Sequence, residues 1–190
     1  MPRSYSALAP VAIQRSSKRQ WTLKPQDLAV ALKLVALRGA WLPYAALAKN
    51  LHLSPFEVHA AVQRLIAVRL AVPREGKVFP VMPALRSFVI HGAPYAYPPV
   101  RGEVTVGFPT AYAVPPLKDE VLFSQEMPPV WPHPEGIARG PALLPLYENL
   151  PLAAKSDPAF YELLALFDAL RMGQAREREL ASRLLQERLR

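Results

Sequence analysis

The sequence contains no cysteine among its 190 residues. This absence excludes a disulfide framework, a thiolate metal site and a cysteine nucleophile. No apolar run approaches the roughly 20 residues that a membrane-spanning helix needs, and the first residues lack the apolar core of a secretory signal peptide. We therefore expect a cytoplasmic protein that makes no membrane contact.

Signatures of enzymatic chemistry are also missing. The chain has no glycine-rich phosphate loop, no His-Glu-x-x-His metal motif and no Gly-x-Ser-x-Gly nucleophile motif. The histidines lack the spacing of metal ligands; they are His52, His59, His91 and His133. We predict that the protein is not an enzyme and has neither a metal site nor a cofactor.

Acidic residues are scarce, with 15 Asp and Glu against 23 Lys and Arg and a formal net charge of +8. Residues 1–92 hold 13 basic and 3 acidic residues, a net charge of +10, whereas residues 93–154 carry −3 and residues 155–190 carry +1. The basic excess therefore lies in the first half. It indicates a polyanionic partner, most simply nucleic acid; the alternative is a solvated basic surface that aids solubility.

Glycine is sparse at 8 residues, but proline is abundant at 22, and 13 of the prolines lie between Ala93 and Pro151. An apolar fraction of 51% argues against wholesale disorder. Together with charge, the proline distribution divides the chain into four parts. These are a basic arm (1–22), an N-terminal domain (23–92), a proline-rich extended middle (93–154) and C-terminal helices (155–190).

The N-terminal domain shows three helical patterns in succession. The first runs from Pro25, a favourable first helical residue, to a stop at Gly39, and a short second helix is predicted over residues 43–50. A capping box then starts a third helix, in which Ser54 caps and Glu57 bonds back to the Ser54 N–H. Its core positions would be Val58, Val62, Leu65 and Ile66.

An extended segment, a turn and a second extended segment follow at residues 70–81. Gly76 supplies the positive φ that a tight hairpin requires, and Arg74 and Lys77 make its tip basic. Three helices followed by such a hairpin predict a winged helix-turn-helix. The expected fold class is mainly α with a small β wing, a proline-rich extended middle and a C-terminal helix pair.

The stretch Leu42–Val81 resembles the MarR-like family of small winged-helix transcriptional regulators. The resemblance rests on the run from Ala45 to Ser54, on the apolar positions that follow it and on the hairpin. It implies a repressor-like regulator that binds double-stranded DNA with sequence preference, as a homodimer.

Residues 140–147 and 163–171 resemble a bacterial group described as such regulators. That group is similar to the winged-helix antitoxins of abortive-infection systems. This second resemblance implies an alternative function. The protein would then be an antitoxin or adaptor that binds and neutralises a nucleotidyltransferase-like toxin and autoregulates its operon.

In the winged-helix family the outer face of the third helix enters the major groove. Here that face follows the cap residue Ser54 and would carry Phe56, His59, Gln63 and Arg64. Gln63 can pair with adenine and Arg64 with guanine, His59 can reach a base edge, and Phe56 can contact a thymine methyl. The alternatives are Phe56 packed against the second helix, a solvated His59, and Arg64 on phosphate only.

Basic residues outside this helix would add phosphate contacts. Arg74 and Lys77 at the wing tip would reach phosphates or an adjacent minor groove, unless they form an ordinary charged hairpin tip. The N-terminal arm, with Arg15, Lys18 and Arg19, would enter a minor groove; the alternative is a disordered leader.

Predictions for the middle are coarser. Residues 83–91 predict a fourth helix that ends at Gly92. Short strands are expected at 103–106 and 120–123. The stretch 128–134 has polyproline character and is expected to form a rigid surface loop; the alternative is a partner-binding element.

Two C-terminal helices are predicted, one capped by Asp157 and running to Arg171, the other over residues 175–189. Their apolar stripes exceed what a helix hairpin can hide, so we expect a dimer interface or a partner-docking surface. The alternative is that they fold back onto the proline-rich middle. The interface residues would be Phe160, Leu163, Phe167, Leu170, Leu180 and Leu184.

Overall fold

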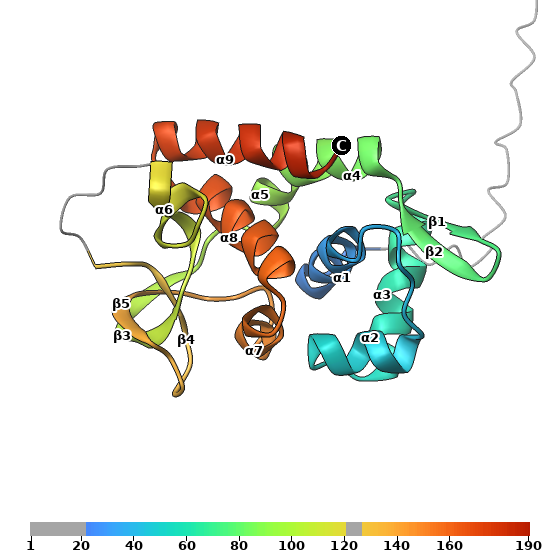
Figure 1. The fold of residues 1–190 in the computed structure, drawn as a ribbon, viewed down its shortest axis with the longest axis horizontal. Coiled ribbons are helices and arrows are strands. Elements are labelled where there is room, and N and C mark those ends of the chain that lie inside the picture. Colours follow the sequence, from blue (N-terminus) through green and yellow to red (C-terminus); the bar gives the residue numbers. More distant parts are fainter. Residues whose placement is uncertain (1–21, 121–126) are drawn as a thin grey trace, which may run out of the picture.

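The computed structural model describes residues 22–120 and 127–190 (Figure 1). The predicted basic arm, with Arg15, Lys18 and Arg19, lies outside the described residues, as do residues 121–123 of the second predicted strand. Within the described ranges the chain is mixed α and β, mainly helical, with one two-stranded and one three-stranded sheet.

The three predicted N-terminal helices are present as α1 (Pro25–Ala36), α2 (Tyr44–Leu51) and α3 (Pro55–Ala67). The capping box is confirmed, because the Glu57 N–H donates to Ser54 Oγ at 3.2 Å and the Ser54 N–H donates to Glu57 Oε2 at 2.8 Å. Helix α1 ends slightly before Gly39, since the preceding Arg38 already adopts the left-handed conformation, with φ 50°.

The predicted hairpin is also confirmed. Strands β1 (Ala71–Arg74) and β2 (Lys77–Pro80) pair antiparallel, with Arg74 opposite Lys77. Glu75 and Gly76 connect them with φ values of 50° and 73°, the left-handed pair that a two-residue turn of type I′ requires. The tip therefore presents Arg74 and Lys77 on either side of a tight turn.

The helix after the hairpin does not end at Gly92. Three segments follow one another directly: α4 (Met82–Ser87), the π-helical turn η1 (Phe88–Gly92) and α5 (Ala93–Ala96). Gly92 has a negative φ of −111°, so it does not form the left-handed stop that the prediction assumed. The helical path continues to Ala96.

The proline-rich middle forms a small closed sheet of β3 (Arg101–Pro109), β4 (Val130–Pro132) and β5 (Ala138–Leu143). Strand β3 pairs antiparallel with both others, and β4 meets β5 in parallel where Val130 lies opposite Ala142. The strand predicted at 103–106 lies within β3. The 3-10 turn η2 (Ala111–Ala113) and helix α6 (Leu117–Glu120) follow β3.

Two predictions for the middle differ from the structure. Glu120 lies in helix α6 and not in a strand, while residues 121–123 of that predicted strand lie outside the described residues. Trp131 is fully buried in β4 instead of lying in a surface loop. The reason is a tertiary partner, since Trp131 Nε1 donates to Asp168 Oδ2 at 2.7 Å and its ring stacks on Tyr161.

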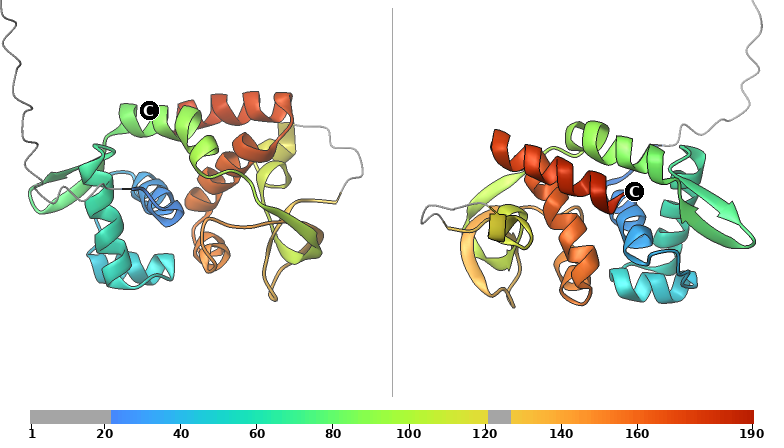
Figure 2. Two further views of the ribbon diagram at one scale, coloured as in Figure 1. Left: turned by 180° about the vertical axis from the view of Figure 1, so that it is seen from behind. Right: turned by 45° about the horizontal axis from the view of Figure 1, so that its top comes forward.

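The C-terminal part holds α7 (Leu150–Lys155), α8 (Pro158–Met172) and α9 (Ala175–Arg188), and Asp157 caps α8 as predicted. Figures 1 and 2 show α8 between α1 on one side and β3–β5 on the other. Residues 163–169 of α8 are all buried. A helix buried on every side is a core element.

The assignment of the C-terminal apolar stripe to a dimer interface is therefore wrong. Four of its six side chains are already buried by the same chain, with no more than 6% exposed, and the other two are partly buried against that core. The alternative, that the C-terminal helices fold back onto the proline-rich middle, is closer to the structure. The stripe packs on α1 as well as on that middle region. The four buried residues are Phe160, Leu163, Phe167 and Leu184, and the two partly buried ones are Leu170 and Leu180.

One ion pair attaches the start of α8 to α1, and a second lies within α8. Lys33 Nζ of α1 lies 2.6 Å from Asp157 Oδ2. Burial alone would raise the pKa of the Asp157 carboxyl, but hydrogen bonds from Lys33 and from the Phe160 N–H outweigh it, so this pKa lies below its usual value. Within α8, Arg171 Nε donates to Asp168 Oδ1, one turn earlier, at 2.8 Å.

Asp168 is the polar centre of the contact between α8 and the three-stranded sheet. Thr110 Oγ1 and Trp131 Nε1 each donate to its Oδ2 at 2.7 Å. Arg171 in turn donates from its second terminal nitrogen to the Leu144 carbonyl at 3.0 Å. Every polar atom of this buried group thus has partners, as a buried charge requires.

No helix in residues 22–120 or 127–190 is long and apolar enough to cross a membrane.

Removal of α8 and α9 should abolish folding. A chain that ends at Pro151 also loses most of α7 and uncovers α1, whose residues 27–34 are all buried in the intact protein. We expect no cooperative thermal transition by circular dichroism, because the apolar surface that remains cannot be hidden. A truncated chain that melts cooperatively would contradict the central position of α8.

Asp168→Ala should lower the free energy of unfolding by about 3–5 kcal/mol, because it leaves the Arg171 guanidinium buried without its counter-charge. The matched control is Glu120→Ala, which breaks the exposed pair with Arg183 and should change stability by less than about 1 kcal/mol. Urea denaturation of both variants measures the difference, and equal effects would contradict the role of Asp168.

Candidate nucleic-acid interface

Helix α3 presents a narrow outward face. Its inner side buries Val58, Ala61, Val62 and Leu65. The helical spacing then leaves Phe56, His59 and Gln63 exposed on the opposite side. Phe56 is 80% exposed, so the alternative that it packs against α2 is wrong. Three of the predicted contact residues therefore share one accessible face.

The cap residue Ser54 is engaged within the helix start. Its hydroxyl accepts the Glu57 N–H and lies 2.8 Å from Glu57 Oε2. The two hydrogen bonds from Ser54 lower the pKa of the Glu57 carboxyl. Ser54 thus fixes where α3 begins, and any contact with a partner would come in addition to that role.

His59 is held by an aromatic neighbour. Its ring meets the Tyr44 ring of α2 edge-on at a centroid distance of 5.2 Å, and Tyr44 meets Trp41 in the same way at 5.6 Å. Partial burial raises the pKa of the Tyr44 hydroxyl. This aromatic group orients His59 while leaving the residue exposed.

Arg64 does not belong to the outward face, and its prediction as a base-contacting residue is wrong. Its Nε and a terminal nitrogen each donate to Asp27 of α1 at 2.6 Å, and only 12% of the side chain is exposed. The bidentate geometry is that of a strong, directional ion pair. Arg64 therefore joins α3 to α1 instead of facing a partner.

Asp27 is the functional residue that the sequence interpretation missed. It is fully buried and also accepts the Lys24 N–H at 2.8 Å. The hydrogen bonds that Arg64 donates to Asp27 raise the pKa of Arg64. Burial, followed by the Asp27 charge, raises the pKa of Tyr97 to about 12. A carboxylate within the apolar run of α1 was the available signal, because such a residue needs a cationic partner.

The hairpin carries the exposed cations. Arg74 and Lys77 are both exposed, and neither has a carboxylate partner among residues 22–120 and 127–190. Lys49 of α2 and Arg69, which follows α3, are likewise exposed and unpaired within those ranges. These positive charges thus lie before and after α3 in the chain, and the outward α3 face itself carries no Lys or Arg.

Among the residues that the structure describes, no three His, Cys, Asp or Glu side chains gather in a way that could hold a metal ion.

Arg64→Ala should act on stability. Because it leaves Asp27 buried without a counter-charge, we expect the free energy of unfolding to fall by about 3–5 kcal/mol. Gln63→Ala, one residue away on the exposed face, should change it by less than about 0.5 kcal/mol. Urea denaturation compares the two.

A double variant distinguishes the effect of removing the whole ion pair from the effect of leaving one charge without its partner. Asp27→Leu with Arg64→Met removes both charges, and it should recover much of the stability that Arg64→Ala loses, because no isolated charge remains. If Arg64→Ala alone is as stable as the wild type, the buried pair does not hold α1 to α3.

Comparisons with known proteins found no match to any family model, to any curated protein or to any solved structure. The assignment of function therefore depends on the residues and geometry described above.

Proposed function

We propose that this protein is a winged helix-turn-helix regulator that binds double-stranded DNA with sequence preference and acts as a repressor. The observation that carries the proposal is the exposed face of α3 together with a hairpin whose strand β1 contacts that helix and whose tip holds two exposed, unpaired cations. In this assignment α2 and α3 are the helix-turn-helix and β1–β2 is the wing. The MarR-like resemblance of Leu42–Val81 agrees with it.

In this proposal α3 enters the major groove. Its first turns would bring Phe56, His59 and Gln63 to the base edges. Gln63 offers the bidentate amide that suits adenine, and Phe56 offers an apolar contact to a thymine methyl. Since Arg64 is withdrawn into its pair with Asp27, base contacts on this helix are few.

Affinity would then come mainly from phosphates. Arg74 and Lys77 on the wing, together with Lys49 and Arg69, are the free cations nearest to α3 in the chain. Contacts from such side chains release counterions, so they give steep salt dependence and little discrimination between sequences. We therefore propose strong electrostatic binding with modest sequence preference.

A second candidate is the antitoxin or adaptor function. It is favoured by the exposure of Phe56, because a large exposed aromatic side chain on a weakly charged helix face is a typical anchor of protein interfaces. The partner would be a nucleotidyltransferase-like toxin. In that case α3 contacts protein, and DNA binding is secondary.

The first experiment is a salt series with duplex DNA from the region upstream of the protein's own gene. We expect the log of the affinity to fall linearly with the log of salt concentration, and Lys77→Ala to reduce the slope by about 0.9 and to weaken specific and random duplexes alike. The control is Lys118→Ala, an exposed cation on α6, which should change neither.

The α3 face is tested in the same assay. Gln63→Ala should reduce discrimination between specific and random duplexes by about 1–3 kcal/mol if it pairs with a base. No duplex binding at low salt would contradict the DNA proposal. Loss of binding to a purified nucleotidyltransferase-like partner on Phe56→Ala, with duplex binding intact, would favour the second candidate for α3.

A further inference from the structure

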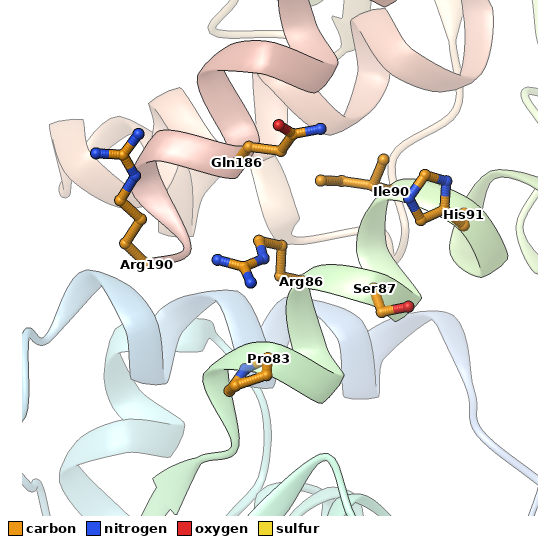
Figure 3. A pocket seen from close by; sticks show the side chains of 7 residues that line it. All are labelled: Pro83, Arg86, Ser87, Ile90, His91, Gln186 and Arg190. Atoms are coloured by element: carbon orange, nitrogen blue, oxygen red, sulfur yellow. The ribbon is translucent and has the colours of Figure 1, made fainter.

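A pocket of about 450 Å³ lies between α4 with η1 and the C-terminal end of α9. Figure 3 shows Arg86 projecting from α4 toward α9, with Gln186 and Arg190 on the α9 side and His91 at the other end. Its volume lies in the range of small-molecule sites. The lining residues are Pro83, Arg86, Ser87, Ile90, His91, Gln186 and Arg190.

The polar side chains of this pocket include two arginines and no acidic side chain. Arg86 and Arg190 are permanently cationic, and neither Asp nor Glu is among the lining residues. None of the five polar side chains makes a hydrogen bond or ion pair within the described residues.

We propose that this pocket binds a phosphate group. Its two arginines supply positive charge and several N–H donors, and a dianion with several acceptor oxygens can accept hydrogen bonds from both. Phosphate oxygens match the donor fork of arginine, while Ser87 and Gln186 can donate further hydrogen bonds. Ile90 and Pro83 supply an apolar wall for whatever carries the phosphate.

Two sources share this chemistry: a small phosphorylated molecule and the backbone of a nucleic acid. The hollow form of the site suits a small molecule. The position of the site is also compatible with the nucleic-acid backbone, since α4 begins two residues after the hairpin strand β2. In Figures 1 and 2, α4 and α9 lie at the edge of the molecule opposite α2. The proposal does not require that α3 binds DNA.

The first arm uses inorganic phosphate as the probe. At constant ionic strength, phosphate should raise the melting temperature of the full chain more than chloride, and it should move the His91 ring signals in an NMR spectrum. Arg86→Gln and Arg190→Gln should each weaken phosphate binding about tenfold or more in calorimetric titrations, since a charge-assisted hydrogen bond is lost. Arg86→Lys should keep part of the binding, and Arg178→Gln, an exposed site elsewhere on α9, should keep all of it.

The second arm compares duplex affinity of the wild type with that of the Arg86→Gln, Arg190→Gln double variant. Phosphate binding with unchanged duplex affinity assigns the pocket to a small phosphorylated molecule. A loss of duplex affinity with a salt slope reduced by about 2 assigns it to the nucleic-acid backbone. The proposal is overturned if wild-type protein shows no phosphate effect on melting or on His91, and the double variant binds duplex as the wild type does. The phosphate measurements on the wild type remain decisive even if a variant fails to fold.

Discussion

The burial of α8 on every side is the constraint on which the rest of the structure depends. Seven consecutive residues, 163–169, are buried with at most 4% exposed, so helices and strands from several parts of the chain must cover this one helix. The only charged residue in that run is Asp168, and it can be tolerated only because Thr110, Trp131 and Arg171 satisfy it. The small sheet of the proline-rich middle is therefore one wall of the core and not a separate appendage.

A second consequence is that two ion pairs connect the core to the candidate interface through α1. Asp157, which caps α8, pairs with Lys33 of α1, and Asp27 at the other end of α1 pairs with Arg64 of α3. Buried pairs of this kind cost desolvation energy, so their contribution lies less in net stability than in fixing which partners meet. We infer that these two pairs set the position of α3 relative to α8, and with it the position of the exposed α3 face.

The parts predicted from sequence are those with local signals. The capping box of Ser54 and Glu57, the Gly76 turn and the Asp157 cap each act within four residues, so the helix starts and the hairpin follow from the chain alone. Arg64, Trp131 and the α8 stripe were misassigned because their partners lie 37 or more residues away in sequence or on several elements at once. An apolar stripe predicts that a helix face is buried, but it does not identify the element that covers that face.

The correction at Arg64 changes the physical character of the candidate interface. With that guanidinium held by Asp27, α3 offers an aromatic ring, an imidazole and an amide, and the full positive charges stand beside it on α2, at the end of α3 and on the wing. In the DNA proposal the cations would contact phosphates, which gives affinity and orientation, and the α3 face would contact bases, which gives sequence preference. The pairing of Arg64 with Asp27 also leaves α3 neutral enough to meet a protein surface. The two proposed functions therefore differ in what the same exposed Phe56 contacts, and not in how the fold presents it.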